Sequence, residues 1–243
     1  MNDLFQSVAD NLLYVLGFLL VIAALFVAAL LLEKAAQKKS GVREKIFSTR
    51  KVAVIGMFSA IAAILMLFDF PLPFAPAFYK LDFSELPILV GTFAFGPVAG
   101  VMMEFVKILL KLLFKGTSTA FVGDLSNFAV GCSLILPASV VYSFRKNKKG
   151  AMLACVVGTL CITAFGTAFN AVYLLPAFSK LYGIPLDSLL ALGAEVNGLV
   201  KEGSIVSFVA ACVAPMNLIK GASVSLVTML IYKPLRPIIK GRR

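Results

Sequence analysis

The chain has 243 residues, of which 60% are hydrophobic and 14% charged, and its formal net charge is +11. A water-soluble domain of this size carries about 25% charged residues, so the composition excludes an ordinary soluble enzyme and predicts an all-α integral membrane protein. Histidine is absent, which excludes imidazole metal sites and histidine-based acid–base catalysis.

The first predicted element is a transmembrane helix within residues 1–33. Residues 11–32 contain no charged side chain, and at about 1.5 Å per residue such a run spans roughly the 30 Å hydrocarbon core. The basic residues follow this run, whereas a cleaved signal peptide carries them in front. We therefore expect a retained helix with its N-terminus outside the cell, and then a basic cytoplasmic linker over residues 34–51.

Residues 52–233 are predicted to form a core of six helices, followed by a basic tail at 234–243. The first core helix covers residues 52–68 and carries two pairs of small residues four positions apart, Gly56 with Ala60 and Ser59 with Ala63. Such a stripe lets another helix approach closely. The stripe is either a docking surface for a partner helix or part of the internal packing.

The stretch "KLDFSELP" at residues 80–87 places three charges between two apolar runs. Asp82 or Ser84 suits the N-cap of the next helix, and the helix dipole favours Glu85 in its first turn. The alternative is that this loop also packs over a site that faces outward.

The apolar run 86–103 contains "GPVAG" at 96–100, a turn signal that predicts helices at 86–96 and 98–114. The second of these helices carries Glu104, Lys107 and Lys111, whose spacing puts them on one helical face. Charges are costly in lipid and mark either a functional site or a paired interior. We expect Glu104 to pair with Lys107 or Lys111, with Lys111 reaching towards the outer surface.

The later helices carry polar groups near their predicted outer ends. Asn217 and Lys220 are three residues apart on the last helix, and together they offer an amide and a cation to a polar heterocycle. Asn170 lies at a comparable depth in the preceding helix, and residues 116–127 add small and hydroxyl side chains. For each group alone, hydrogen bonding between helices is the alternative.

The remaining predicted helices cover residues 125–144, 150–179 and about 214–233. Because Pro215 interrupts the last apolar stretch, we place residues 203–213 in a shorter leading segment.

The distribution of lysine and arginine along the chain predicts its orientation in the membrane. Sixteen of the 23 fall in residues 34–51, in residues 145–149 and in the tail from Lys233. These three segments lie on one side of a seven-span chain, which makes that side, with the C-terminus, cytoplasmic in the plasma membrane. The net charge then reflects topology and anionic lipid, so no nucleic-acid partner is expected.

Two further classes of activity find no support in the residues. The four cysteines lie in apolar runs without CxxC spacing, so we expect buried thiols and no metal site. The stretch "FKGTST" at residues 114–119 does not match the phosphate-loop pattern GxxxxGK[ST]. We therefore expect a protein without ATPase machinery of its own and without catalytic residues.

The motifs "FPLPFAPAFYKLDFSELPILVGTFAFGPVAG", "LLFKGTSTAFVGDLSNFAVG" and "NLIKG" resemble the S components of energy-coupling factor (ECF) vitamin transporters, and most of all their riboflavin-specific members. The resemblance covers about residues 52–233, and the extra helix at 1–33 departs from the family pattern.

The resemblance implies that riboflavin is the transported substrate, with no bound cofactor, and that the partners are a coupling transmembrane subunit and two cytoplasmic ATPases. It implies a gate in the loop at 80–87 and partner docking through Gly56, Ser59, Ala60 and Ala63. The implied ligand-binding residues are Leu81, Phe83, Thr117, Asp124, Asn170, Asn217 and Lys220.

Other functions stay open at this point. The same architecture suits another vitamin or a flavin nucleotide, whose phosphate Lys80, Lys115 or Lys201 would tolerate. A self-sufficient secondary transporter would use Glu104 as a proton carrier. An enzyme acting on lipid is disfavoured, because the chain lacks histidine and a DxxD motif.

Overall fold

The computed structural model describes residues 12–40, 46 and 48–240. In chain order its helices are α2 (Leu12–Ser40), α3 (Thr49–Leu67), α4 (Glu85–Phe95), α5 (Pro97–Lys115), α6 (Val122–Phe144), α7 (Lys148–Phe169), α8 (Leu175–Tyr182), α9 (Leu186–Val196), α10 (Ile205–Phe208) and α11 (Ala214–Lys240). The π-helical turn η1 (Asn170–Leu174) joins α7 to α8, and η2 (Val209–Val213) joins α10 to α11. Strands β1 (Phe70–Pro71) and β2 (Lys80–Leu81) form a short antiparallel ladder.

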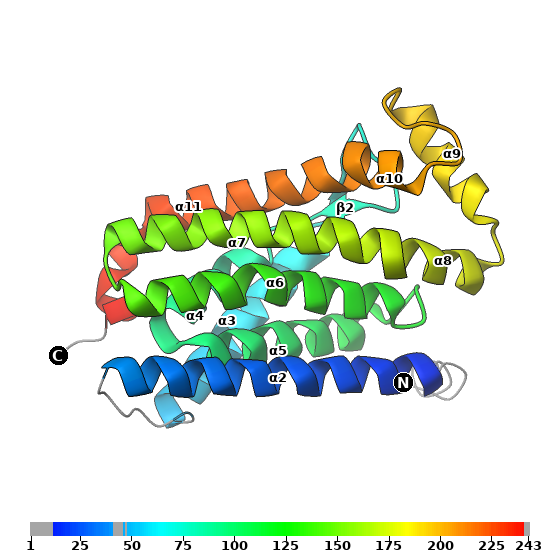
Figure 1. Ribbon diagram of the computed structural model, residues 1–243. Coiled ribbons are helices and arrows are strands. Elements are labelled where there is room, and N and C mark those ends of the chain that lie inside the picture. Colours follow the sequence, from blue (N-terminus) through cyan, green and yellow to red (C-terminus); the bar gives the residue numbers. More distant parts are fainter. Residues whose placement is uncertain (1–11, 41–45, 47, 241–243) are drawn as a thin grey trace.

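The long helices run side by side along the molecule. Figure 1 shows α2, α6, the continuous α7–α8 run and the α10–α11 run in this arrangement, with α9 at one end and β2 in the same half of the molecule. In the described residues, five helical runs are long and apolar enough to cross a membrane: Leu16–Lys38, Thr49–Leu67, Val122–Phe144, Lys148–Tyr182 and Ile205–Tyr232. With the shorter apolar α4 and the charge-bearing α5, they confirm an all-α membrane protein with a six-helix core and one additional N-terminal helix.

The turn between α4 and α5 follows the sequence prediction. Gly96 has a φ of +93°, a conformation that glycine adopts without steric cost. Its backbone N–H donates to the carbonyl of Thr92 over 2.9 Å and ends α4. Pro97 then occupies the first position of α5, where its fixed φ suits a helix and its missing N–H costs nothing.

The last helix starts where the sequence predicts, because α11 begins at Ala214 and the shorter α10 and η2 lead into it. Helical structure is continuous from Ile205 to Lys240, with the π-helical turn η2 just before the proline. Proline cannot donate to the carbonyl four residues earlier, here that of Ala211, and the side chain of Asn197 donates to that carbonyl over 3.1 Å instead. A side chain distant in the sequence therefore replaces the hydrogen bond that the proline removes.

Two predicted boundaries shift. Helix α2 continues to Ser40, so the first part of the predicted linker at 34–51 is helical, and α11 continues to Lys240 through most of the predicted tail at 234–243. Residues with good helix propensity, such as Lys34 and Gln37, extend α2 beyond its apolar run. Residues 1–11, 41–45, 47 and 241–243 lie outside the described residues.

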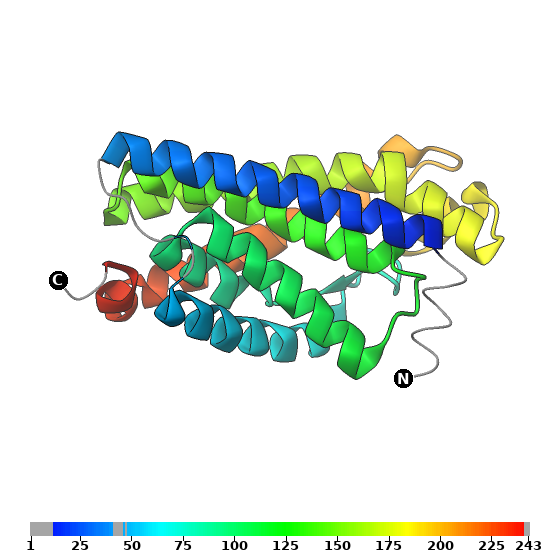
Figure 2. The same cartoon turned by 90° about the horizontal axis from the view of Figure 1, so that it is seen from below.

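The additional helix α2 packs lengthwise on α5 and α6 (Figure 2). Phe18 contacts Phe128 of α6 edge-to-face with ring centroids 6.0 Å apart, and Phe26 contacts Phe105 of α5 at 6.2 Å. Such aromatic pairs add to the packing of buried surface. Leucines on the other side of α2, including Leu20 and Leu31, are exposed, as expected for a face in contact with lipid.

A buried carboxylate fixes the far end of α2. Glu33 is 5% exposed, and its Oε2 accepts a hydrogen bond from the backbone N–H of Val98 over 3.1 Å, in the first turn of α5. Its Oε1 lies 3.5 Å from the Nζ of Lys51 in the first turn of α3. Since an anion is favoured at a helix N-terminus, Glu33 joins α2 to the beginnings of two core helices.

Candidate functional site

A continuous cluster of buried charges joins α4, α5, α11 and the loop that precedes α4. At its centre Lys107 is fully buried. Its Nζ lies 2.6 Å from Oε2 of Glu104 and 3.2 Å from Oε1 of Glu85, and it donates to Oγ of Ser84 over 3.2 Å. Because a buried charge must be paired, these contacts explain how α5 carries a lysine at membrane depth.

The second cation of the cluster is Lys220 of α11. Its Nζ lies 2.9 Å from Oε2 of Glu85 and 3.1 Å from Oδ2 of Asp82. The other oxygen of Asp82 accepts the backbone N–H of Ser84 over 2.8 Å. Although burial raises the pKa of Asp82, the ammonium groups of Lys220 and Lys107 lower it below its usual value, which keeps this carboxylate ionised.

Two of the three charges in "KLDFSELP", Asp82 and Glu85, are therefore internal pairing groups, whereas Lys80 is exposed and pairs with Asp69. Asp82 forms a turn with Ser84, and Ser84 makes no side-chain cap to α4. Glu85 sits in the first turn of α4, as expected, and bridges Lys107 and Lys220.

Glycine makes room for the Glu104 carboxylate. A Cβ added to Gly131 of α6 would lie 2.6 Å from Oε1 of Glu104, closer than real Cβ contacts allow. The predicted pairing of Glu104 with Lys107 is confirmed, whereas Lys111 pairs with Asp124 of α6 at 2.6 Å and also donates to the carbonyl of Gly116.

The two predicted amides meet at Gly166 of α7. Asn170 Nδ2 donates to the Gly166 carbonyl over 2.7 Å. Asn217 of α11 lies against the same glycine, since a Cβ added to Gly166 would come within 2.6 Å of its Nδ2. Asn217 is 3% exposed, and its Nδ2 has no hydrogen-bond partner among the described residues. Lys220 follows three residues later on α11 and contacts Asp82 and Glu85, so the structure brings the two amides together and places Lys220 one helical turn from Asn217.

The segment at residues 70–85 covers these groups with its own side chains. Tyr79 is buried, and its hydroxyl donates to Oδ1 of Asn170 over 2.8 Å. Burial raises the pKa of Tyr79, which keeps the hydroxyl protonated and able to donate. Leu81 is also buried, and the Phe83 ring lies 6.2 Å from that of Phe70 beside the short β-ladder.

Thr117 and Asp124 have local contacts at the junction of α5 and α6. Thr117 Oγ1 accepts the backbone N–H of Phe121 over 3.0 Å, and Asp124 is paired with Lys111. Among the described residues, their hydrogen bonds and ion pairs include none with Asn170, Asn217 or Lys220.

Sequence reasoning missed Tyr79 and the connection of Asp82 and Glu85 to Lys220. No local pattern marks these contacts, because the partners are 91 residues apart for Tyr79 and Asn170, and 138 apart for Asp82 and Lys220. The requirement that a buried cation be paired was the one available signal. It pointed to Lys220 without naming its partners.

The predicted small-residue stripe on α3 is divided between two faces, and the prediction of a single stripe is wrong. Gly56 and Ala60 are exposed, with open space around Gly56. Ser59 and Ala63 are buried, and Ser59 donates to the Met103 carbonyl of α5 over 3.3 Å. Adjacent positions of an α-helix point about 100° apart, so Ala60 lies outside the sector that Ser59 and Ala63 turn towards the core.

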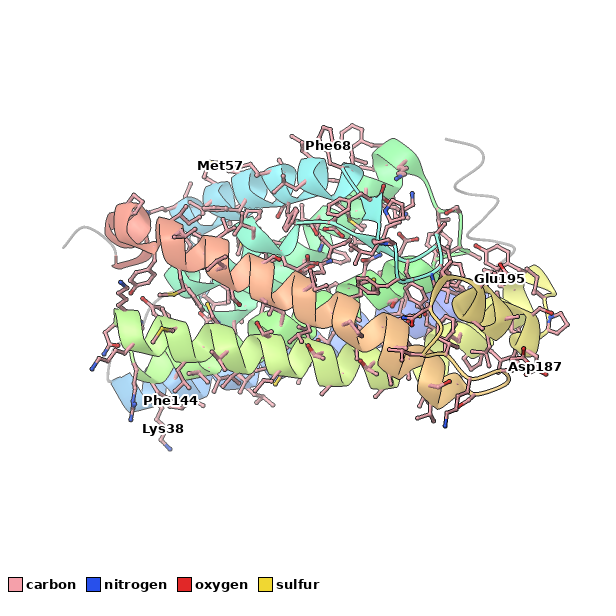
Figure 3. All side chains as sticks on the ribbon, turned by 90° about the horizontal axis from the view of Figure 1, so that it is seen from above. Lys38, Met57, Phe68, Phe144, Asp187 and Glu195 are labelled. Atoms are coloured by element: carbon pink, nitrogen blue, oxygen red, sulfur yellow. The ribbon has the colours of Figure 1, made fainter. Side chains whose placement is uncertain are left out.

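The exposed face of α3 also carries large apolar side chains. Met57 and Phe68 are 53% and 72% exposed, and both project away from the other helices at the same edge of the molecule (Figure 3). This edge offers Gly56 and Ala60 to lipid or to another helix.

The described residues contain no group of three or more histidine, cysteine, aspartate or glutamate side chains that could hold a metal ion. Three of the four cysteines are buried and all four are free. The candidate site consists of the two amides of Asn170 and Asn217 and the paired Lys220, covered by the segment at residues 70–85.

Comparison with known proteins decides the family. The profile of the family described as "ECF transporter, substrate-specific component" matches residues 50–232. The chain belongs to this family of S components. The riboflavin transporter FmnP of Bacillus subtilis is 30% identical over 195 residues, which cover 80% of this chain and 96% of that protein.

Two further likenesses extend this result. The riboflavin transporter RibU of Staphylococcus aureus is 32% identical over 191 residues, covering 79% of this chain and 93% of that protein. A solved structure of the S component of a bacterial ECF transporter superposes with a TM-score of 0.61 at 33% identity, covering 79% of this chain and 98% of that one. Since the family match begins at residue 50, α2 lies ahead of the part that this S component shares with its family.

Proposed function

We propose that this S component captures riboflavin from the outer side of the plasma membrane for an ATP-driven importer. The observation that carries the proposal is that Asn170 and Asn217 adjoin at Gly166, while Tyr79 and Asp82 of the segment at residues 70–85 contact Asn170 and Lys220. A flavin is a flat apolar ring system with polar edges, which suits an apolar site with a few placed polar groups. Relatives named as riboflavin transporters, matched over most of this chain, support the choice of ligand.

Each residue has a proposed role at this site. The amides of Asn170 and Asn217 pair with the donor and acceptor edges of the heterocycle, and Lys220 donates to a carbonyl or hydroxyl oxygen. Leu81 and Phe83 supply apolar wall from the loop. Thr117 and Asp124 act less directly, by holding the junction of α5 and α6.

Charge at the two ends of the molecule supports the orientation. Lys38 lies at one end, together with the end of α6 marked by Phe144, while Asp187 and Glu195 of α9 lie at the opposite end (Figure 3). The basic segment Arg145–Lys149 follows α6 directly. Because cytoplasmic loops are enriched in lysine and arginine, the binding end with β2 and α9 faces outward.

Two observations bear on the alternatives. A proton-coupled secondary transporter would use Glu104 as its carrier, but Glu104 is buried and paired at 2.6 Å with Lys107. For a flavin nucleotide, Lys80 and Lys115 both lie 3.4 Å from Asp69, with exposed side chains. They form a basic pair near the outer end that could contact a phosphate. Competition between riboflavin and flavin mononucleotide therefore tests this alternative.

Uptake measured with and without the partners tests the proposal. We expect cells that express this chain with the coupling subunit and both ATPases to accumulate riboflavin, and cells that express this chain alone to show only surface binding. Uptake that persists without the ATPases would establish the secondary transporter. Accumulation of flavin mononucleotide in preference to riboflavin would assign the nucleotide.

A further inference from the structure

The segment at residues 70–85 occupies the same polar groups that the proposed ligand needs. The acceptor oxygen of Asn170 is taken by the Tyr79 hydroxyl at 2.8 Å, and its Nδ2 is taken by Gly166. The ammonium group of Lys220 is held between Asp82 and Glu85. Asn217 differs, because its Nδ2 is buried and has no hydrogen-bond partner among the described residues.

The ring of Tyr79 is held by packing contacts in addition to the hydrogen bond of its hydroxyl. Tyr79 is 5% exposed, its ring centroid lies 4.8 Å from that of Phe78 and 6.1 Å from that of Phe208 at the start of the last helical run. Its backbone N–H donates to the Pro76 carbonyl over 2.9 Å. A phenol fixed in this way presents a flat ring and one donor to the site.

The β1–β2 ladder holds the ends of the segment with few interactions. The ladder pairs Phe70 with Leu81 and Pro71 with Lys80, and proline has no N–H to donate to such a ladder. The Lys80–Asp69 contact beside it is solvent-exposed at 3.4 Å, and exposed ion pairs add little stability. Elsewhere the segment is held by Asn197, whose side chain donates to the Phe74 carbonyl over 3.2 Å, and by the burial of Ala75 and Leu81. Tyr79 and Asp82 are the contacts by which it engages the proposed ligand-binding residues Asn170 and Lys220.

We propose that Tyr79 is an internal competitor for the binding site, whose hydroxyl must leave Asn170 before riboflavin can pair with that amide. This inference rests on the proposed function. Molecules in which Tyr79 occupies Asn170 cannot bind riboflavin, so the apparent association constant is the intrinsic one multiplied by the fraction of open molecules. Removing the hydroxyl leaves Asn170 Oδ1 unpaired in the closed state only. The closed state is then destabilised relative to the riboflavin-bound state.

The decisive variant is Tyr79→Phe, which keeps the ring and removes the competing donor. We expect riboflavin to bind roughly 2- to 10-fold more tightly, the effect of one net hydrogen bond, with the gain in the association rate. The matched control is Tyr182→Phe, because Tyr182 donates to the Ser118 carbonyl over 3.0 Å at an exposed position, and it should bind as the wild type does.

Amide hydrogen exchange without riboflavin gives a second readout. In Tyr79→Phe the amides of residues 70–85 should exchange faster, because opening of the segment is favoured, while those of α6 keep their wild-type rates.

The outcomes separate the two proposals. Wild-type protein that binds riboflavin, with Tyr79→Phe binding equally or more weakly, would overturn the competition and leave the proposed function standing. Unchanged exchange of residues 70–85 would overturn it as well. Folded wild-type protein that does not bind riboflavin would overturn the proposed function and, with it, the competition.

Discussion

Individual charges in this membrane protein are positioned by partners from other elements. Lys107 of α5 and Lys220 of α11 share Glu85 of α4, and the Asp82 and Glu104 carboxylates complete the set. Taking one ion out of such a set leaves another charge uncompensated in a medium of low polarity. The cluster therefore couples the loop over the site to three helices.

The first residue-scale prediction concerns Lys107. Lys107→Met should lower the free energy of unfolding by about 3–5 kcal/mol, because it leaves Glu85 and Glu104 without their central cation. Thermal melting in detergent measures the effect. Lys115→Met is the control and should cost less, because the side chains of Lys115 and its partner Asp69 are 48% and 26% exposed, and exposed ion pairs add little stability. Equal melting temperatures for both variants would contradict the central role of Lys107.

The second concerns Asn217. Asn217→Ala should weaken riboflavin binding by about 1–3 kcal/mol, or roughly 5- to 150-fold, with little change in melting temperature, because its Nδ2 has no hydrogen-bond partner among the described residues. Titration of riboflavin fluorescence provides the measurement. Lys220→Met should also weaken binding, but it should destabilise the fold as well, since Asp82 and Glu85 lose a cation. Wild-type affinity in Asn217→Ala would assign this amide to helix packing.

At the scale of elements, α3 presents a different surface to each side. Gly56 and Ala60 lie on its exposed face, and Ser59 and Ala63 lie against the core. We therefore confine the proposed docking surface to the exposed pair. Small residues there would let a helix of the coupling subunit approach the backbone closely.

This division makes a prediction for tryptophan substitutions on α3. Ala60→Trp should leave riboflavin binding by the isolated S component nearly unchanged and abolish its co-purification with the coupling subunit. Ser59→Trp should instead lower the melting temperature, because the Ser59 position is fully buried beside Met103. If Ala60→Trp assembles normally, docking does not use this face.

The additional helix α2 makes its own prediction through Glu33. Glu33→Ala removes the acceptor of the Val98 N–H and a partner of Lys51, so unfolding should become easier by about 1–3 kcal/mol. Lys34→Ala, one residue later and exposed, is the control and should melt as the wild type does. An unchanged melting temperature in Glu33→Ala would mean that α2 is a passive anchor.

At the scale of the whole molecule, sequence reasoning succeeded where the determinants are local. Apolar runs of membrane length, the glycine–proline turn at Gly96 and the pairing of Glu104 with Lys107 all depend on neighbours within a few residues. It failed where distant chain segments decide the outcome. Asn197 donates to the Ala211 carbonyl, which Pro215 leaves without its helical donor, and Tyr79 donates to Asn170 across 91 residues.

The central claim is that an S component with this site binds riboflavin, and titration of purified protein against riboflavin fluorescence tests it most directly. Stacking and burial of the flavin in the apolar site should quench its emission until protein and riboflavin are equimolar. Thiamine and biotin, added in excess, should not restore it. Folded, monodisperse protein that leaves riboflavin emission unchanged over the whole titration would contradict the account.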